Sequence, residues 1–121
     1  MSMLSDATKW LHDQAHDHLA DTITYRRGEQ EVSLAATVGR SEFEIERETG
    51  VIVSFESRDY IFRATDLVLG GATVEPADGD RIVEAGRIYE VLAPGDHPAW
   101  RWSDPFRTAF RVHTKYIGLD S

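Results

Sequence analysis

The sequence predicts a mainly β protein: a small antiparallel β-barrel or sandwich preceded by one N-terminal α-helix. Apolar residues repeat at every second position in several short runs, and turns that contain glycine separate these runs. The runs recur about every eight to twelve residues, as in small antiparallel β-domains. The chain has 121 residues, of which 41% are hydrophobic. We therefore expect residues 1–121 to form a single domain with one core.

The helix is expected at residues 4–20. Its apolar residues fall three or four positions apart on one helical stripe, at Leu4, Ala7, Leu11, Ala15 and Leu19. Ser5 fits the N-cap, and Asp6 suits the positive end of the helix dipole. His12 and His16 have a spacing that lets two imidazoles meet one divalent ion. Because the spacing supplies no third ligand, we interpret them as part of a solvated helix face and predict no metal site.

The β-barrel is expected at residues 22–118. Alternating apolar residues at 23–25 and 32–38 predict a hairpin whose polar turn contains Gly28. Phe43 and Ile45 then alternate with three acidic residues, Glu42, Glu44 and Glu46. This pattern predicts a third strand with one buried face and one acidic face in water.

The next segment, residues 51–69, contains two apolar stretches separated by the polar residues 56–59, so a hairpin with its turn at 56–59 is expected. A loop around Gly70 and Gly71 should follow it. The pair Asp78-Gly79 predicts a tight turn.

Two brief strands, at residues 82–83 and 88–92, are then expected on either side of Gly86, and a closing strand at 108–117. Between the strand at 88–92 and the closing strand, residues 94–105 contain three prolines and two tryptophans. This composition predicts a surface loop.

Charge and composition exclude several classes of function. The chain carries 13 Lys and Arg residues against 21 Asp and Glu residues, a formal net charge of −8. Such a charge repels a phosphate backbone, so sequence-specific nucleic-acid binding is not expected. Cysteine is absent, which excludes disulfides and thiolate metal sites. No secretory pattern or apolar run of about 20 residues occurs, so we expect a cytoplasmic protein without membrane contact.

No catalytic site is predicted. Ser103, Asp104 and His113 supply the residue types of a hydrolase triad, but the serine lacks the surroundings of a nucleophile elbow. Asp104 before Pro105 fits a turn better. The acidic run at 42–46 is typical of a solvated outer face rather than of paired catalytic carboxylates. We therefore expect no enzyme and no cofactor, and a hydrolase remains only a third hypothesis.

Trp100 and Trp102 offer large aromatic area at alternate positions. Together with Arg101 and Arg107 they form a candidate protein interface, because tryptophan and arginine are common anchors of interfaces. Two alternatives stay open: both tryptophans could cap the core, or they could form a stacking platform for a small ligand or a carbohydrate. In the second case, the glutamates at 42–46 would accept hydrogen bonds.

The C-terminal third resembles head-tail joining (head-completion) proteins of tailed phages and prophages. The resemblance covers residues 74–118 and rests on VEPADGDRIVEAGRIYEVLAPG and WRWSDPFRTAFRVHTKYIG. A Pro-to-Gly-Asp turn, a strand with Tyr-Glu-Val and a closing Arg-x-His-Thr segment follow in that order. The matched positions are Pro76, Gly79, Asp80, Gly86, Tyr89, Glu90, Val91, Trp102, Asp104, Arg111, His113 and Thr114.

The resemblance implies a small β-barrel with one helix that assembles as a homo-oligomeric connector ring between the capsid portal or adaptor and the tail. It also implies that the protein has no catalytic residues and ends in the virion, at the head-tail junction, after assembly in the cytoplasm. Most of the matched positions are expected to maintain the fold rather than to contact partners. The acidic composition agrees, since a ring that passes DNA should not hold it tightly.

Overall fold

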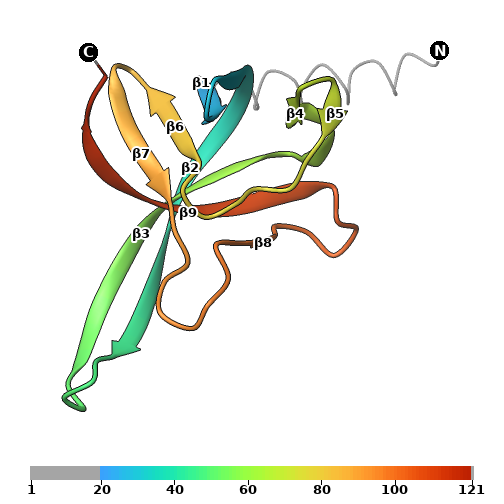
Figure 1. Cartoon of the computed structure of the whole chain (residues 1–121). Coiled ribbons are helices and arrows are strands. Elements are labelled where there is room, and N and C mark those ends of the chain that lie inside the picture. The colour runs from blue at the N-terminus through green and yellow to red at the C-terminus, as the bar shows by residue number, and fades with distance from the viewer. Residues whose placement is uncertain (1–19, 121) are drawn as a thin grey trace.

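The computed structural model describes residues 20–120, and this part of the chain is mainly β (Figure 1). It contains one short 3-10 helix, η1 (Ala64–Asp66), and nine strands: β1 (Ala20–Arg27), β2 (Gln30–Glu46), β3 (Ile52–Arg63), β4 (Val68–Leu69), β5 (Ala72–Thr73), β6 (Arg81–Glu84), β7 (Arg87–Val91), β8 (Trp100–Trp102) and β9 (Ala109–Leu119). The helix predicted at 4–20, with His12 and His16, lies outside the described residues, apart from Ala20, where β1 begins.

Seven strands form one antiparallel sheet in the order β3-β2-β1-β6-β7-β9-β8, and β4 and β5 form a separate pair. β9 changes neighbours along its length: residues 109–114 pair with β3, residues 110–112 pair with β8 as well, and residues 114–119 pair with β7. The predicted antiparallel β architecture is confirmed, but the strands do not form a closed barrel. At residues 42–56, β2 and β3 pair with each other and run away from the rest of the sheet (Figure 1).

β2 and β3 are longer than the sequence suggested. β2 continues without interruption through residues 30–46, so the second strand of the first hairpin and the acidic run are one strand. β3 is equally continuous, and the turn expected at 56–59 is wrong. Ser57 and Asp59 lie inside β3 with almost fully buried side chains. A strand tolerates these polar residues because their side chains are hydrogen bonded.

The main core lies on one face of the sheet, where alternate residues of neighbouring strands meet. Its buried members include Ile23, Tyr25, Leu34, Ala36, Tyr60, Phe62, Ile82, Tyr89, Val91, Phe110 and Val112. Phe62 is central, because its ring lies 6.0 Å from the rings of both Tyr25 and Phe110. The predicted turns at Gly28 and Gly86 are confirmed, and both glycines adopt the positive φ that such tight turns require.

Residues 94–105 do not form a loop throughout, contrary to the prediction. Residues 100–102 form β8, which pairs with residues 110–112 of β9. The period of a three-residue strand is too short to recognise in the sequence, and only the presence of β9 alongside supplies its hydrogen-bond partners. Pro94 and Ala99, which precede the strand, are buried.

The hairpin of residues 42–56, which we call the arm, has two unlike faces. In the β2–β3 register, Phe43 lies opposite Phe55 and Ile45 lies opposite Val53, which makes one face apolar. The other face carries the acidic residues. Alternation along β3 places Phe55 on the same side as Asp59, whereas Tyr60 points into the main core. The apolar face of the arm therefore lies on the side of the sheet opposite the main core.

Two phenylalanines provide a matched test of this architecture. Phe62→Ala should lower the free energy of unfolding by about 3 to 5 kcal/mol, because it opens a cavity in the core. Phe106→Ala should leave it within about 0.5 kcal/mol of the native value, since Phe106 is 84% exposed. Urea denaturation followed by circular dichroism measures both. Equal losses for the two variants would contradict the assignment of the core.

Candidate functional site

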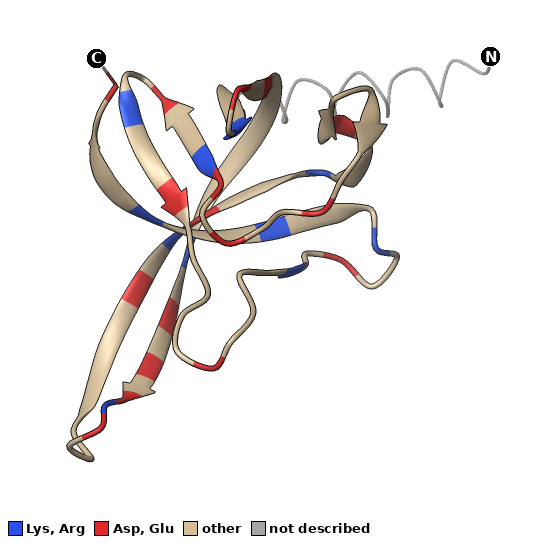
Figure 2. Cartoon of the chain, in the orientation of Figure 1, with Lys and Arg blue, Asp and Glu red and all other residues tan. Residues whose placement is uncertain are grey.

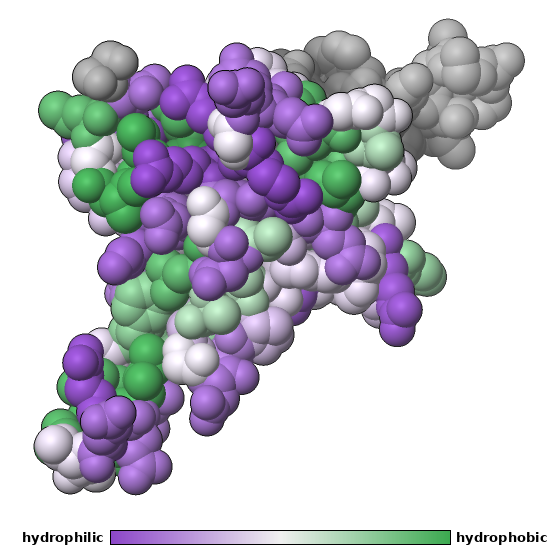
Figure 3. All heavy atoms as spheres, viewed as in Figure 1, coloured by the Kyte–Doolittle hydropathy of each residue, from purple (hydrophilic) through white to green (hydrophobic). Residues whose placement is uncertain are grey.

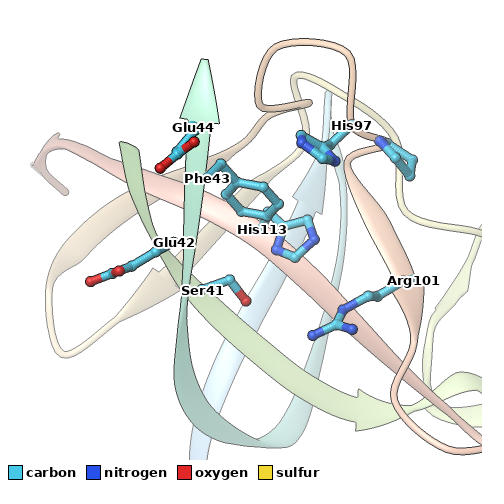
Figure 4. Close-up of a pocket in the computed structure, with 8 residues that line it drawn as sticks. Ser41, Glu42, Phe43, Glu44, His97, Arg101 and His113 are labelled. Carbon is cyan, nitrogen blue, oxygen red and sulfur yellow. The ribbon is translucent and has the colours of Figure 1, made fainter. Parts of the chain in front are cut away.

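An open groove of about 610 Å³ lies at the base of the arm, between β2 and the segment that leads into β8 (Figure 4). It is lined by Ser41, Glu42, Phe43, Glu44, His97, Pro98, Arg101 and His113. The ring of Phe43 lies 4.8 Å from that of His97 and 4.9 Å from that of His113. Arg101 points into the groove, whereas the side chains of Glu42 and Glu44 point away from it (Figure 4). The groove thus has an aromatic floor with one arginine at its side.

Beneath the groove lies a buried carboxylate, Asp59, whose side chain has no exposed surface. The hydroxyls of Ser41 and Ser57 each donate to it at 2.5 Å. Arg111 Nε donates to Asp59 Oδ2 at 2.6 Å, and His113 Nδ1 lies 2.9 Å from Oδ1. These four partners come from β2, β3 and β9, so a single carboxylate connects the three strands where the arm leaves the sheet.

The surroundings of Asp59 keep it ionised. Burial by itself would raise its pKa, but the hydrogen bonds from His113, Ser41, Ser57 and Arg111 outweigh burial and hold the pKa far below the usual range. A buried charge is tolerated only when it is paired and hydrogen bonded, and Asp59 meets this condition.

The segment of residues 92–99 closes over the apolar face of the arm. Both ends of this segment bind the backbone of His113. Leu92 N–H donates to the His113 carbonyl at 3.1 Å, and His113 N–H donates to the Ala99 carbonyl at 2.9 Å. Gly95 packs so closely on Ile45 that an added Cβ would lie 3.3 Å from its side chain. Phe43 and Ile45, both half-buried, therefore pack against this segment.

A second cluster surrounds Asp80, which directly precedes β6. Tyr25 Oη donates to Asp80, Arg27 donates to it through Nε at 2.9 Å and Nη2 at 2.8 Å, and Ala77 N–H donates at 2.9 Å. Burial and the hydrogen bond to Asp80 raise the pKa of Tyr25. All of these contacts are within the chain, so Asp80 holds the turn at 77–80 against β1.

Glu84 makes a similar set of contacts. It accepts hydrogen bonds from Arg58 and Tyr60, both at 2.7 Å, and the guanidinium of Arg58 stacks 4.9 Å from the ring centre of Tyr89. Burial opposes ionisation of Glu84, but the hydrogen bonds from Arg58 and Tyr60 outweigh it and lower the pKa. This carboxylate therefore joins β6 to β3, and Arg58 extends the contact to Tyr89 of β7.

The predicted hydrolase residues do not meet. The carboxylate of Asp104 accepts hydrogen bonds from the N–H groups of Thr108 and Ala109 and from the Thr108 hydroxyl, as expected for a turn. His113 contacts Asp59 instead. The nearby Ser57 hydroxyl donates to Asp59 at 2.5 Å, whereas it lies 3.5 Å from His113 Nδ1, and all three side chains are buried. This arrangement supports the fold and offers no accessible nucleophile.

The four residues predicted as an interface do not share one surface. Trp100 and Trp102 lie on the core side of β8, half-buried, with rings 4.8 and 5.0 Å from that of Phe110. Arg101 lies on the opposite side and lines the groove. Arg107 is exposed in the turn between β8 and β9. The two indole planes meet at 90°, so they form no flat platform.

The glutamates predicted as an acidic face lie on the arm. Glu42, Glu44 and Glu46 are exposed on one side of the arm, and Glu56 of β3 joins them opposite Glu42 (Figure 2). Sequence reasoning did not identify Asp59, Ser57 or Ser41 as a cluster. Ser57, Asp59 and Ile61 occupy every second position, as residues on one face of a strand do. The polar run at 56–59 is equally compatible with a turn, so the pattern did not decide between the two.

Among residues 20–120, no group of three side chains that could hold a metal ion is found. Nor does this part of the chain contain a helix that is long and apolar enough to cross a membrane. A family model described as phage head-tail joining protein matches residues 1–121. No curated protein sequence matches the chain.

Removal of the buried charge gives a test of the cluster. Asp59→Asn should lower the free energy of unfolding by about 3 kcal/mol, since Arg111 and His113 lose their anionic partner. Asp66→Asn, at an exposed position, is the control and should change it by less than about 0.5 kcal/mol.

The same variant tests the pH dependence. Because the pKa of Asp59 is depressed in the folded state, its contribution is complete above the ordinary carboxyl pKa of about 4 and is lost as the pH falls further. Native stability should therefore decline between about pH 5 and pH 2. Asp59→Asn should show a shallower decline in urea titrations at each pH. An unchanged slope would contradict the role given to this carboxylate.

Proposed function

The chain belongs to the phage head-tail joining protein family, and from this premise we propose that it is a connector subunit that forms a ring with other copies of itself between the portal or adaptor and the tail. The family match over residues 1–121 is the observation that carries this proposal. It establishes a structural role in phage assembly, which involves other head and tail proteins. The ring, the portal contact and residence at the head-tail junction after cytoplasmic assembly are our proposals.

The arrangement of polar groups supports a role through surface contacts. The buried carboxylates Asp59, Asp80 and Glu84 each bind partners within the chain and hold strands together. Several of the positions in the predicted family pattern, Asp80, Asp104, Arg111 and His113, make such intrachain contacts. The acidic arm, the groove and the turn between β8 and β9 are three surfaces that partners could contact.

The predicted interface residues can serve assembly in two ways. Arg101 and Arg107 are exposed and are available for contacts with a partner. Trp100 and Trp102 anchor β8 on Phe110 and leave only part of each ring accessible. We propose that the two arginines make polar contacts with a partner, and that the exposed parts of the tryptophans, on the other side of β8 from Arg101, make separate apolar contacts. The carbohydrate alternative is not favoured, because perpendicular rings give a sugar no flat face on which to stack.

Complementation tests the proposed function. In a phage that lacks this gene, heads and tails should remain unjoined, and the native chain supplied in trans should restore joined particles, counted by electron microscopy. The double variant Arg101→Glu, Arg107→Glu should keep the native melting temperature and reduce joining at least about tenfold, because reversed charges oppose the interface. Arg87→Glu, at an exposed position of β7, is the control. Normal joining by the double variant would contradict the interface, and failure of the native chain would contradict the function.

The tryptophans require a different readout. Trp102→Ala should lower the free energy of unfolding by on the order of 3 kcal/mol, because the indole packs on Phe110 at the edge of the core. Thermal unfolding followed by fluorescence of the remaining tryptophans measures the loss. A variant with native stability and defective joining would show that Trp102 acts only in the interface.

A further inference from the structure

Phe106 is the most exposed large hydrophobic residue in residues 20–120, with 84% of its surface accessible. The turn that carries it is well held. Asp104 accepts three hydrogen bonds from Thr108 and Ala109, at 2.8 to 3.0 Å, and Arg107 N–H donates to the Asp104 carbonyl at 3.2 Å. The turn thus presents an aromatic ring to solvent on a fixed backbone, which is a preorganised contact group.

The backbone at this turn is also strained. Arg107 has a φ of 58°, a conformation that is unfavourable for a residue with a side chain. Such strain persists where the surrounding structure enforces it and is often found at functional positions. A glycine at position 107 would relieve the strain, but this chain has an arginine beside the exposed phenylalanine.

A second arginine lies next to the turn. Arg63 pairs in register with Ala109, and the N–H of the following Ala64 donates to the Thr108 carbonyl at 2.9 Å. Arg63 and Arg107 are both exposed, and neither forms an ion pair with another residue of the described chain, 20–120. We call Arg63, Phe106 and Arg107 the knob. It combines two unpaired positive charges with one exposed aromatic ring.

The arm carries the complementary features. Its acidic face presents Glu42, Glu44 and Glu46, none of which is ion-paired within residues 20–120. Ile52, which is 63% exposed, lies opposite Glu46 in the register and therefore on the same face. Val51 at the tip is exposed as well. Figure 2 shows the acidic residues along the arm, and Figure 3 shows hydrophobic and hydrophilic residues side by side at its end.

We propose that the knob of one copy binds the acidic face of the arm of a second copy. This inference rests on the proposed connector function and names the surfaces that join its subunits. Phe106 packs on Ile52, and Arg107 and Arg63 pair with Glu46 and Glu44 around this apolar contact. An apolar centre with a charged rim is the usual organisation of a protein interface, and the charges set its register.

A second copy is favoured over other partners because one chain carries both halves of a complementary pair. The knob and the arm belong to different elements, the β8–β9 turn and the β2–β3 hairpin. The contact is therefore heterologous, so each copy keeps a free knob and a free arm after one contact forms. Repetition of a heterologous contact produces a ring when the rotation closes.

Disulfide trapping tests this contact directly, because the native chain has no cysteine. The double variant Arg107→Cys, Glu46→Cys should form a ladder of covalent oligomers under mild oxidation. A mixture of the two single variants should give a covalent heterodimer that does not grow, and neither single variant alone should dimerise efficiently. The control pair Arg87→Cys, Glu46→Cys should stay monomeric. A ladder in the control only, or no heterodimer in the mixture, would overturn the proposal.

Sedimentation equilibrium of the full chain gives an independent readout. The native chain should self-associate with rising concentration, and Phe106→Ser and the double variant Glu44→Arg, Glu46→Arg should each weaken association at least about tenfold, while their melting temperatures stay native. Mixed, these two variants still offer one intact knob and one intact arm, and they should form a dimer. Leu119→Ser and Glu29→Arg, at exposed positions elsewhere, are the controls. A native chain that remains monomeric up to about 1 mM would overturn the proposal.

The complementation assay separates this inference from the proposed function. If the native chain joins heads to tails and Phe106→Ser does so equally well, the connector function holds and the knob contact is wrong. If the native chain does not restore joining but the double variant Arg107→Cys, Glu46→Cys shows the predicted disulfide ladder, the self-association holds and the connector function is wrong.

Discussion

The hydrogen bonds of Asp59 hold together the region on which the arm and the groove both depend. Its carboxylate receives donors from Ser41, Ser57 and Arg111 and contacts His113, so β2, β3 and β9 are joined at one point. A buried charge without partners would be strongly destabilising. The three strands must therefore bring all four partners of Asp59 within hydrogen-bond distance of its carboxylate. The same histidine binds both ends of segment 92–99 through its backbone, which extends the influence of the cluster to the loop above it.

The cluster also marks the place where the apolar side of the sheet changes. In the body of the protein, Tyr60 and Phe62 face the main core, whereas Phe55 on the arm faces the opposite side. A two-stranded hairpin alone is only marginally stable in water. Segment 92–99 packs against Phe43 and Ile45 and partly buries this face of the arm.

Acidic residues have two separate uses in this chain. Asp59, Asp80 and Glu84 are mostly buried and serve as hydrogen-bond acceptors that hold strands together. The glutamates of the arm are exposed, so their negative charges act on molecules in the surrounding solvent. Such charges guide association with a basic surface and oppose the binding of a phosphate backbone. The net charge alone does not reveal this division, because it depends on which carboxylates the fold encloses.

The sequence by itself determined the features that arise from local patterns. Alternation and turn residues predicted the hairpin around Gly28, the strands on either side of Gly86 and the closing strand, and the C-terminal motifs indicated the family. Only the tertiary structure decided that residues 56–59 continue a strand and that residues 100–102 form one. A polar side chain such as Asp59 can enter a strand when distant donors satisfy it, and β8 exists because β9 lies beside it. Both depend on contacts between residues far apart in the chain, which no local periodicity encodes.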